Sequence, residues 1–270
     1  MATVSITING RVVRAEKGEM LLDVIRREGI DIPTPCAHKA VEAFGACRLC
    51  TVEITKDDWK GWKNYVTSCL YPVEAGLIVF THSQPVIDLR KTLLDLQLAR
   101  HPNTPLIQEM AAQYGVLKTS YEELPDPNDC ILCALCTRVC DTMGFAAIST
   151  VGRGHGKKVA PPLDQPPPAC VGCLACAQVC PTNYIKFTQS GAHREIWGKA
   201  FDMVACNRCG KPVITKEFAD NLAANRNIPR EYFDVCDDCH RKELAATMGR
   251  IANWTREGTG EETSRKEVTR

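Results

Sequence analysis

The sequence CILCALCTRVC occupies residues 130–140, and CVGCLACAQVCP repeats its spacing at residues 170–181. Both runs read C-x2-C-x2-C-x3-C, a spacing in which three cysteines within seven residues can bind three irons of a [4Fe–4S] cubane. Because such a short loop cannot bend to present a fourth ligand, we expect the last cysteine of each run to bind the other cluster and to begin a helix. The repeat therefore predicts two linked [4Fe–4S] clusters.

Interleaved ligation assigns four thiolates to each cubane. The first set is Cys130, Cys133, Cys136 and Cys180, and the second is Cys140, Cys170, Cys173 and Cys176. An apolar jacket is expected to keep water off the sulfurs, supplied by Ile131, Leu135, Ile148, Val171, Leu174 and Ile185. The sequence VGRGHGK at residues 151–157 is not G-x-G-x-x-G. We interpret it as a turn between two strands of this domain rather than as a phosphate-binding loop.

Composition indicates whether the sixteen cysteines bind metal or form disulfides. They fall into four quartets with none left over. The 270 residues carry 33 Lys and Arg against 32 Asp and Glu, a net charge of +1 that implies no polyanionic partner. No apolar run approaches the roughly 20 residues of a membrane span, and the N-terminus alternates like a strand rather than a signal peptide. We therefore expect a cytoplasmic protein, in which thiols stay reduced and bind metal rather than form disulfides.

The first quartet, C-x10-C-x2-C-x18-C, combines a separate cysteine, a close pair and a distant fourth, which suits a [2Fe–2S] cluster held by four thiolates. Its members are Cys36, Cys47, Cys50 and Cys69. Alternation at residues 4–8, a turn at Asn9-Gly10 and helical spacing at residues 20–25, ended by Gly29, predict strands around one crossing helix. Further alternation at residues 52–54 and 77–79 completes a predicted β-grasp domain. Small residues at 37, 45 and 46 would let backbone amides approach the sulfurs.

The fourth quartet is two C-x2-C pairs separated by 26 residues, a spacing typical of a tetrahedral, structural zinc site. Its members are Cys206, Cys209, Cys236 and Cys239. A further iron–sulfur cluster or a rubredoxin-like single iron are the alternatives. Gly210 permits the turn after the second thiolate, and residues 242–248 predict a helix, as in a treble-clef or zinc ribbon. Acidic residues at 234, 237 and 238 and the lack of a basic stripe favour a protein partner over nucleic acid.

Residues 35–53 carry a specific resemblance. Pro35-Cys36 and GACRLCTVE at 45–53 resemble the N-terminal ferredoxin domain of the large iron–sulfur subunit of complex I. The same domain occurs in the diaphorase small subunit of NAD-reducing hydrogenases and in the electron-transfer region of iron-only hydrogenases. Ser68-Cys69, followed by Pro72, Gly76 and Val79, is similar to the fourth-ligand segment of that family.

This sequence also differs from the family pattern in one segment. In the family, a long helix and a His-Pro pair precede three cysteines that bind another [4Fe–4S] cluster. Here an apolar stripe predicts the helix, and His101-Pro102 follows it, but residues 103–129 contain no cysteine. We interpret His101 as a helix C-terminal residue favoured by the helix dipole. The stripe consists of Val86, Leu89, Leu93, Leu94, Leu96 and Leu98.

The sequence thus predicts an α+β chain in five parts. These are a [2Fe–2S] domain at 1–80, a helical linker with a lost cluster site at 81–125, a two-[4Fe–4S] ferredoxin-like domain at 126–195, a four-cysteine zinc-ribbon or treble-clef-like domain at 196–254, and a polar, frayed tail at 255–270. No P-loop, dinucleotide fingerprint or nucleophile motif is present, so we expect no catalytic residue.

The resemblance implies a non-catalytic electron-transfer subunit of a multi-subunit, NAD(P)-linked oxidoreductase. A flavin- and NAD-binding subunit would be one partner, and a catalytic hydrogenase or dehydrogenase subunit the other. The alternative is a freely diffusing polyferredoxin. Near-zero net charge speaks against that alternative, because transient carriers commonly use charge for steering. A catalytic iron-only hydrogenase would need several hundred further residues.

Overall fold

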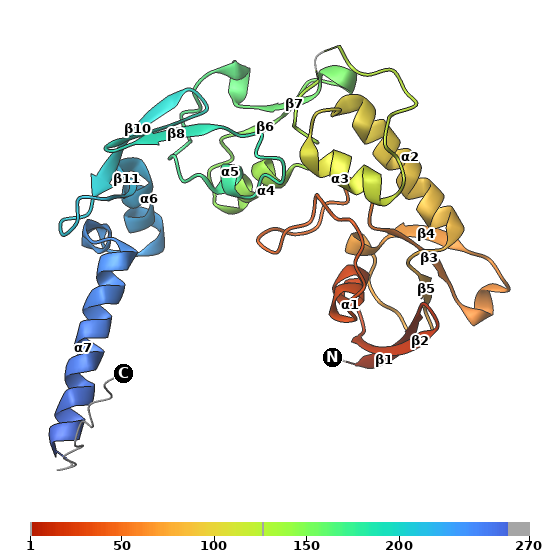
Figure 1. Ribbon diagram of the computed structural model, residues 1–270, viewed down its shortest axis with the longest axis horizontal. Coiled ribbons are helices and arrows are strands. Elements are labelled where there is room, and N and C mark those ends of the chain that lie inside the picture. The colour runs from red at the N-terminus through yellow and green to blue at the C-terminus, as the bar shows by residue number, and fades with distance from the viewer. Residues whose placement is uncertain (1, 126, 259–270) are drawn as a thin grey trace, which may run out of the picture. The chain divides into compact units, whose positions relative to one another are not determined.

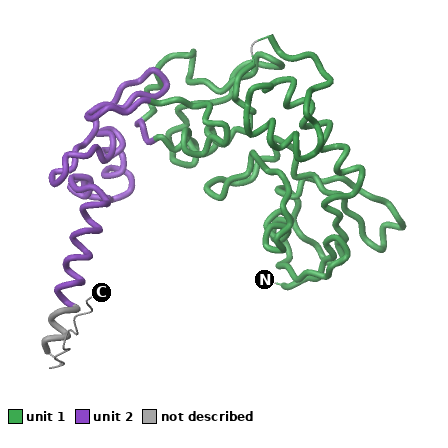
Figure 2. The backbone as a smooth tube through the Cα atoms, in the orientation of Figure 1, with its two compact units in different colours: residues 1–170, 174–187 green, residues 171–173, 188–270 purple. Residues whose placement is uncertain are grey.

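The computed structural model describes residues 2–125 and 127–258 and shows a mixed α/β chain. It divides into two compact units, residues 1–170 with 174–187 and residues 171–173 with 188–270 (Figures 1 and 2). Most of the predicted polar tail lies outside the described residues, but the last helix continues through Gly258, so residues 255–258 are not a frayed coil. No helix within the described ranges is long and apolar enough to cross a membrane.

The N-terminal part of the first unit is a five-stranded sheet in the order β2-β1-β5-β3-β4. The strands are β1 (Thr3–Ile8), β2 (Arg11–Glu16), β3 (Thr51–Thr55), β4 (Asn64–Thr67) and β5 (Ile78–Phe80). The predicted Asn9-Gly10 turn is confirmed, since both residues have positive φ and join the antiparallel pair β1–β2. Helix α1 (Leu21–Arg27) buries four apolar side chains in the core of this sheet. Its end at a left-handed Gly29 is also as predicted.

Two helices follow the sheet, α2 (Gln84–Arg100) and α3 (Pro105–Gln113). They share a small apolar core with the cysteine-bearing loop, formed by Leu49, Leu94, Leu98, Ile107, Met110 and Ala111. The predicted stripe is wrong at Leu96, which is 46% exposed. The buried row instead contains Arg90, one turn from both Val86 and Leu94.

The two-cluster segment repeats in its backbone as well as in its cysteine spacing. Leu132 and Ala134 adopt positive φ in the first run, and Gly172 and Leu174 do so in the second. Helices α4 (Leu135–Thr142) and α5 (Ala175–Gln178) begin directly after these turns. The prediction that the last cysteine begins each helix is therefore wrong, because each helix already begins one residue before the third cysteine, directly after the left-handed residue. Between the runs, β6 (Ser149–Val151) and β7 (Lys158–Ala160) pair, which confirms the turn at 151–157.

The second unit is built on an antiparallel sheet in the order β11-β10-β9-β8. Its elements are β8 (Phe187–Ser190), β9 (His193–Ile196), β10 (Lys199–Ala205), β11 (Pro212–Thr215), α6 (Lys216–Arg226) and α7 (Asp237–Gly258). The Thr215 hydroxyl caps α6 by accepting the amide of Phe218 at 3.3 Å. Short 3-10 turns complete the chain at Asp57–Trp59, Ser68–Leu70, Gly154–Gly156, Pro162–Asp164 and Arg230–Asp234.

Candidate metal centres

The first quartet is arranged as two pairs of thiols. The Sγ atoms of Cys36 and Cys47 lie 3.3 Å apart, and those of Cys50 and Cys69 lie 3.4 Å apart. Cys36 comes from the loop after α1, the middle two cysteines from the loop before β3, and Cys69 from the 3-10 turn after β4. Two pairs of thiolates are what two irons of a binuclear cluster require, so this donor set fits a [2Fe–2S] cluster.

Hydrogen bonding within the two pairs shifts the pKa values of the four thiols. The thiol–thiol hydrogen bond with Cys47 lowers the pKa of Cys36 to about 6, and the one with Cys69 lowers the pKa of Cys50 to about 6. The pKa values of Cys47 and Cys69 are raised in turn by the hydrogen bond to the partner thiol and by burial. The Cys47 amide also donates to Cys36 Sγ at 3.5 Å, a backbone contact of the predicted kind. Metal binding would release the remaining protons.

Arg90 fastens the cysteine loop to α2 and was missed by sequence reasoning. Its side chain is fully buried, and it donates from Nε to the Leu49 carbonyl and from Nη2 to the Thr51 carbonyl, both at 2.9 Å. A third bond joins Nη1 to the Tyr114 hydroxyl at 3.2 Å. The sequence feature that could have identified Arg90 is its position one turn from Val86 and from Leu94, on the buried face of the helix. Leu49 lies between Cys47 and Cys50, so Arg90 positions the loop that carries both.

We expect Arg90→Met to destabilise the chain and loosen the first quartet. The substitution leaves two buried carbonyls without partners, each costing about 1–3 kcal/mol. Thermal unfolding of the metal-bound chain should occur several degrees lower, and chelators should strip the [2Fe–2S] cluster faster. Lys91→Met, at the next and exposed position, is the matched control. An unchanged melting temperature for Arg90→Met would contradict this role.

The four cysteines assigned to the first cubane line one small cavity in the first unit, together with Val159 and Ile185. The fold therefore brings Cys180 to the first run, from which it is separated by 40 residues and more in sequence. Burial raises the pKa of Cys133 to about 11 and that of Cys136 to about 12. These thiols need the positive charge of bound iron to ionise at neutral pH. The donor set fits a [4Fe–4S] cluster.

The predicted apolar jacket is present around these cysteines in part. Leu135, Ile148, Leu174 and Ile185 are buried, whereas Ile131 and Val171 are half-buried. Of the second cubane's cysteines, Cys140 is buried on α4 and its Sγ accepts the Ala147 amide at 3.3 Å. Cys140, Cys170 and Cys176 belong to the first unit and Cys173 to the second, so this ligand set stays a prediction from spacing.

His101 is a structural anchor rather than a charged helix end. It is buried at the C-cap of α2, and burial lowers its pKa, which makes it neutral at pH 7. Its position at the end of α2 is as predicted, but burial disfavours the charged form that the helix dipole would stabilise. Nδ1 lies 2.6 Å from the Asn128 carbonyl oxygen, and the Asn128 side chain accepts the Cys130 amide at 2.9 Å. Through Asn128, His101 holds the entry to the first cubane loop.

The fourth quartet converges in the second unit. Its four sulfurs all lie within 4.8 Å of one another, with Cys206 and Cys209 after β10 and Cys236 and Cys239 at the start of α7. Gly210 has the predicted positive φ. The Cys236 amide donates to Cys206 Sγ at 3.3 Å and lowers the pKa of Cys206 to about 6. A tetrahedron with Zn–S bonds of about 2.3 Å has sulfurs about 3.8 Å apart, so the donor set fits a single zinc ion.

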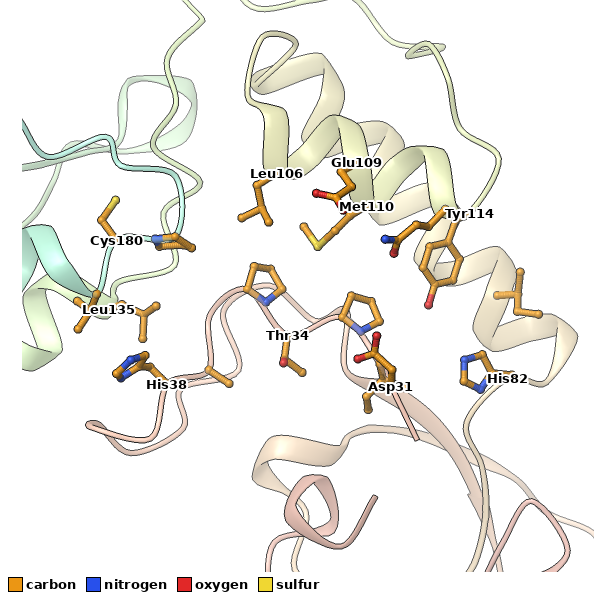
Figure 3. Close-up of a pocket in the computed structure, with 18 of the residues that line it drawn as sticks. Asp31, Thr34, His38, His82, Leu106, Glu109, Met110, Tyr114, Leu135 and Cys180 are labelled. Atoms are coloured by element: carbon orange, nitrogen blue, oxygen red, sulfur yellow. The ribbon is translucent and has the colours of Figure 1, made fainter. Parts of the chain in front are cut away.

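A cavity of about 910 Å³ borders both predicted cluster regions of the first unit. Its walls are the loop at residues 31–38, helix α3, and the segment around Cys180 (Figure 3). Asp31, His82 and Glu109 are among its ionisable residues. Within the described residues, no hydrogen bond or ion pair joins any two of these three side chains, so they form no acid–base pair. The cavity reaches Cys180, a predicted ligand of the first cubane, and the loop that leads to Cys36.

Comparison with known proteins identifies the N-terminal segment. Residues 1–84 match the family of 2Fe-2S iron-sulfur cluster binding domains, and this range contains the whole first quartet. The segment is a 2Fe-2S domain. Its two thiol pairs, its sheet and α1 therefore belong to a single cluster-binding unit, and Arg90 contacts that domain from α2.

Relatives of the chain extend beyond the 2Fe-2S domain, and they are subunits of redox enzymes. An NADP-reducing hydrogenase subunit (HndD) of Solidesulfovibrio fructosivorans is 29% identical over 229 residues, which are 73% of this chain and 37% of that protein. The alpha subunit of an NADPH-Fe(3+) oxidoreductase of Geobacter sulfurreducens is 32% identical over 204 residues, 67% of this chain and 24% of that protein. This chain thus matches less than two fifths of either relative.

A complex I subunit and a solved hydrogenase complete the comparison. The mitochondrial NADH-ubiquinone oxidoreductase 78 kDa subunit of Neurospora crassa is 27% identical over 190 residues, covering 61% of this chain and 25% of that protein. A chain of the crystal structure of an NAD+-reducing [NiFe]-hydrogenase in the H2-reduced state superposes with a TM-score of 0.52 at 27% identity, over 60% of this chain and 76% of that chain. The resemblance to complex I and NAD-reducing hydrogenase subunits is confirmed.

Proposed function

We propose that this chain is the electron-transfer iron–sulfur subunit of a multi-subunit, NAD(P)-linked oxidoreductase of hydrogenase or dehydrogenase type. The observation that carries the proposal is the convergence of the cysteines into metal-sized groups. The 2Fe-2S domain presents two thiol pairs, and four more cysteines meet at one small cavity in the same unit. A redox chain needs such centres close enough for electrons to pass between them.

The cofactor set that we propose is one [2Fe–2S], two [4Fe–4S] and one zinc. The clusters supply one-electron transfer when bound, and the residues around them supply position, burial and hydrogen bonds that tune the potential. The order of strands around α1 supports a β-grasp architecture for the 2Fe-2S domain. Single-ion spacing in the fourth quartet supports zinc in a treble-clef-like or ribbon-like domain, rather than a further cluster.

The partners that we propose follow from the relatives. A flavin- and NAD-binding subunit would exchange electrons with this chain on one side, and a catalytic hydrogenase or dehydrogenase subunit on the other. The names of the relatives, an NADP-reducing hydrogenase subunit and an NADPH-Fe(3+) oxidoreductase subunit, support the NAD(P) link. A cytoplasmic location accords with the need of sixteen cysteines for reducing surroundings.

Anaerobic purification of the tagged chain from its native host tests this function. We expect a stoichiometric complex that contains flavin and in which NADH or NADPH reduces the iron–sulfur clusters of this chain. The chain alone should not be reduced by either nucleotide. A monomeric chain, loaded with clusters and reduced by a separate reductase without complex formation, would instead support the freely diffusing polyferredoxin.

A further inference from the structure

Arg138 connects the 2Fe-2S domain to the first cubane loop. It lies on α4 between Cys136 and Cys140, which interleaved ligation assigns to different cubanes. From there its guanidinium reaches the loop that carries Cys36. Nη2 donates to the Cys36 carbonyl at 2.9 Å, Nη1 donates to the Glu42 carbonyl, and the guanidinium carbon lies 5.4 Å from the centre of the Phe44 ring.

The same side chain also holds the loop of the first cubane. Nε donates to the Ala134 carbonyl at 3.2 Å, and Nη2 makes a longer contact of 3.4 Å with the Cys133 carbonyl. One nitrogen atom therefore contacts the backbone of a [2Fe–2S] ligand and the backbone of a [4Fe–4S] ligand. Cys36, Cys133 and Arg138 all belong to the first unit, so this bridge lies within one compact body.

The charge of Arg138 is not neutralised by a carboxylate. Among the described residues, the ion pairs of this chain do not include Arg138, and its hydrogen bonds all go to carbonyl oxygens. A positive charge beside an iron–sulfur cluster stabilises the added electron and raises the reduction potential. The guanidinium thus acts on both neighbouring sites at once, through position and through charge.

We propose that Arg138 is a positioning residue that fixes the 2Fe-2S cluster loop against the first cubane loop and so controls electron transfer between them. The inference rests on the proposed function. In the step, one electron leaves one cluster and enters the other, and no bond forms and no proton moves.

The test uses the full chain, anaerobically loaded with iron and sulfide, and the variants Arg138→Met and Arg138→Lys. Arg153→Met is the matched control, because Arg153 is exposed in the β6–β7 turn of the same unit. Three quantities are measured: iron per chain, the redox ratio of the [2Fe–2S] cluster at a fixed potential, and the broadening of its electron paramagnetic resonance by the reduced cubane.

Arg138→Met should keep its iron but shift the [2Fe–2S] redox ratio about tenfold toward the oxidised form, which corresponds to about 59 mV for one electron. It should also lose the broadening. Arg138→Lys should keep the ratio and lose the broadening, because an ammonium retains the charge without the planar set of donors. The control should match the wild type.

Intact clusters with unchanged redox ratio and broadening in Arg138→Met would overturn this inference alone. If Arg138→Met loses iron, the test rests on Arg138→Lys. Broadening of the [2Fe–2S] signal in Arg138→Lys that equals that of the wild type would then overturn the inference. A wild-type chain that shows no [2Fe–2S] and no cubane signals would overturn the proposed function and this inference together.

Discussion

Replacing Cys180 by serine should abolish the cluster of Cys130 rather than that of Cys170. Cys180 lies in the second run, yet it lines the same small cavity as Cys130, Cys133 and Cys136. A serine oxygen is a poor ligand for iron compared with a thiolate, so one cubane should be lost. Iron should fall from about ten to about six atoms per chain, as the loss of four irons requires.

The comparison that identifies the lost cluster uses two reference variants. Cys130→Ser removes a ligand of the first cubane, and Cys173→Ser removes one of the second. The electron paramagnetic resonance spectrum of Cys180→Ser should match that of Cys130→Ser, and Cys140→Ser should match Cys173→Ser. If Cys180→Ser matched Cys173→Ser instead, each run would bind its own cluster and the interleaved assignment would be wrong.

Replacing Cys236 by alanine should have the largest effect on the second unit. Cys236 is buried, links the start of α7 to Cys206, and belongs to the tight group of four sulfurs. Among the described residues, the buried members of the small apolar core around α6 are Ile214, Ala219 and Phe233, so bound metal should contribute much of the stability. Structural zinc binding contributes about 10–16 kcal/mol in small zinc-finger peptides.

We therefore expect Cys236→Ala to lose its zinc and to be cleaved by proteases within residues 206–251 at rates at least tenfold higher. The cluster signals of the first unit should persist. Asp237→Asn, an exposed neighbour outside the group of ligands, should behave as the wild type. Resistance to proteolysis equal to the wild type in a zinc-free Cys236→Ala protein would show that the metal does not stabilise this unit.

Features that depend on local spacing could be predicted from the sequence. The Asn9-Gly10 hairpin, α1 with its terminal Gly29, and the turn at 151–157 all have short-range signals. The grouping of the first and fourth quartets also follows from spacing, because loop length limits which cysteines can share a metal. In the hairpin, the helix end and the turn, the deciding residues are neighbours in the chain.

Features that depend on contacts between distant segments could not be predicted. Arg90 and Arg138 reach backbone carbonyls about 40 and about 100 residues away, and an arginine in a helix carries no signal that names such a partner. The starts of α4 and α5 were misplaced because Ala134 and Leu174 adopt positive φ, a conformation that neither residue type favours. His101 was misjudged because its burial depends on the segment before Cys130.

Metal analysis of the full chain, purified anaerobically and combined with quantitative electron paramagnetic resonance, tests the central claim most directly. The account predicts about ten iron atoms and about one zinc per chain, with one [2Fe–2S] and two [4Fe–4S] signals after reduction. About fourteen irons without zinc would contradict the zinc assignment. About two irons, with no cubane signal, would contradict the claim that this chain relays electrons through linked clusters.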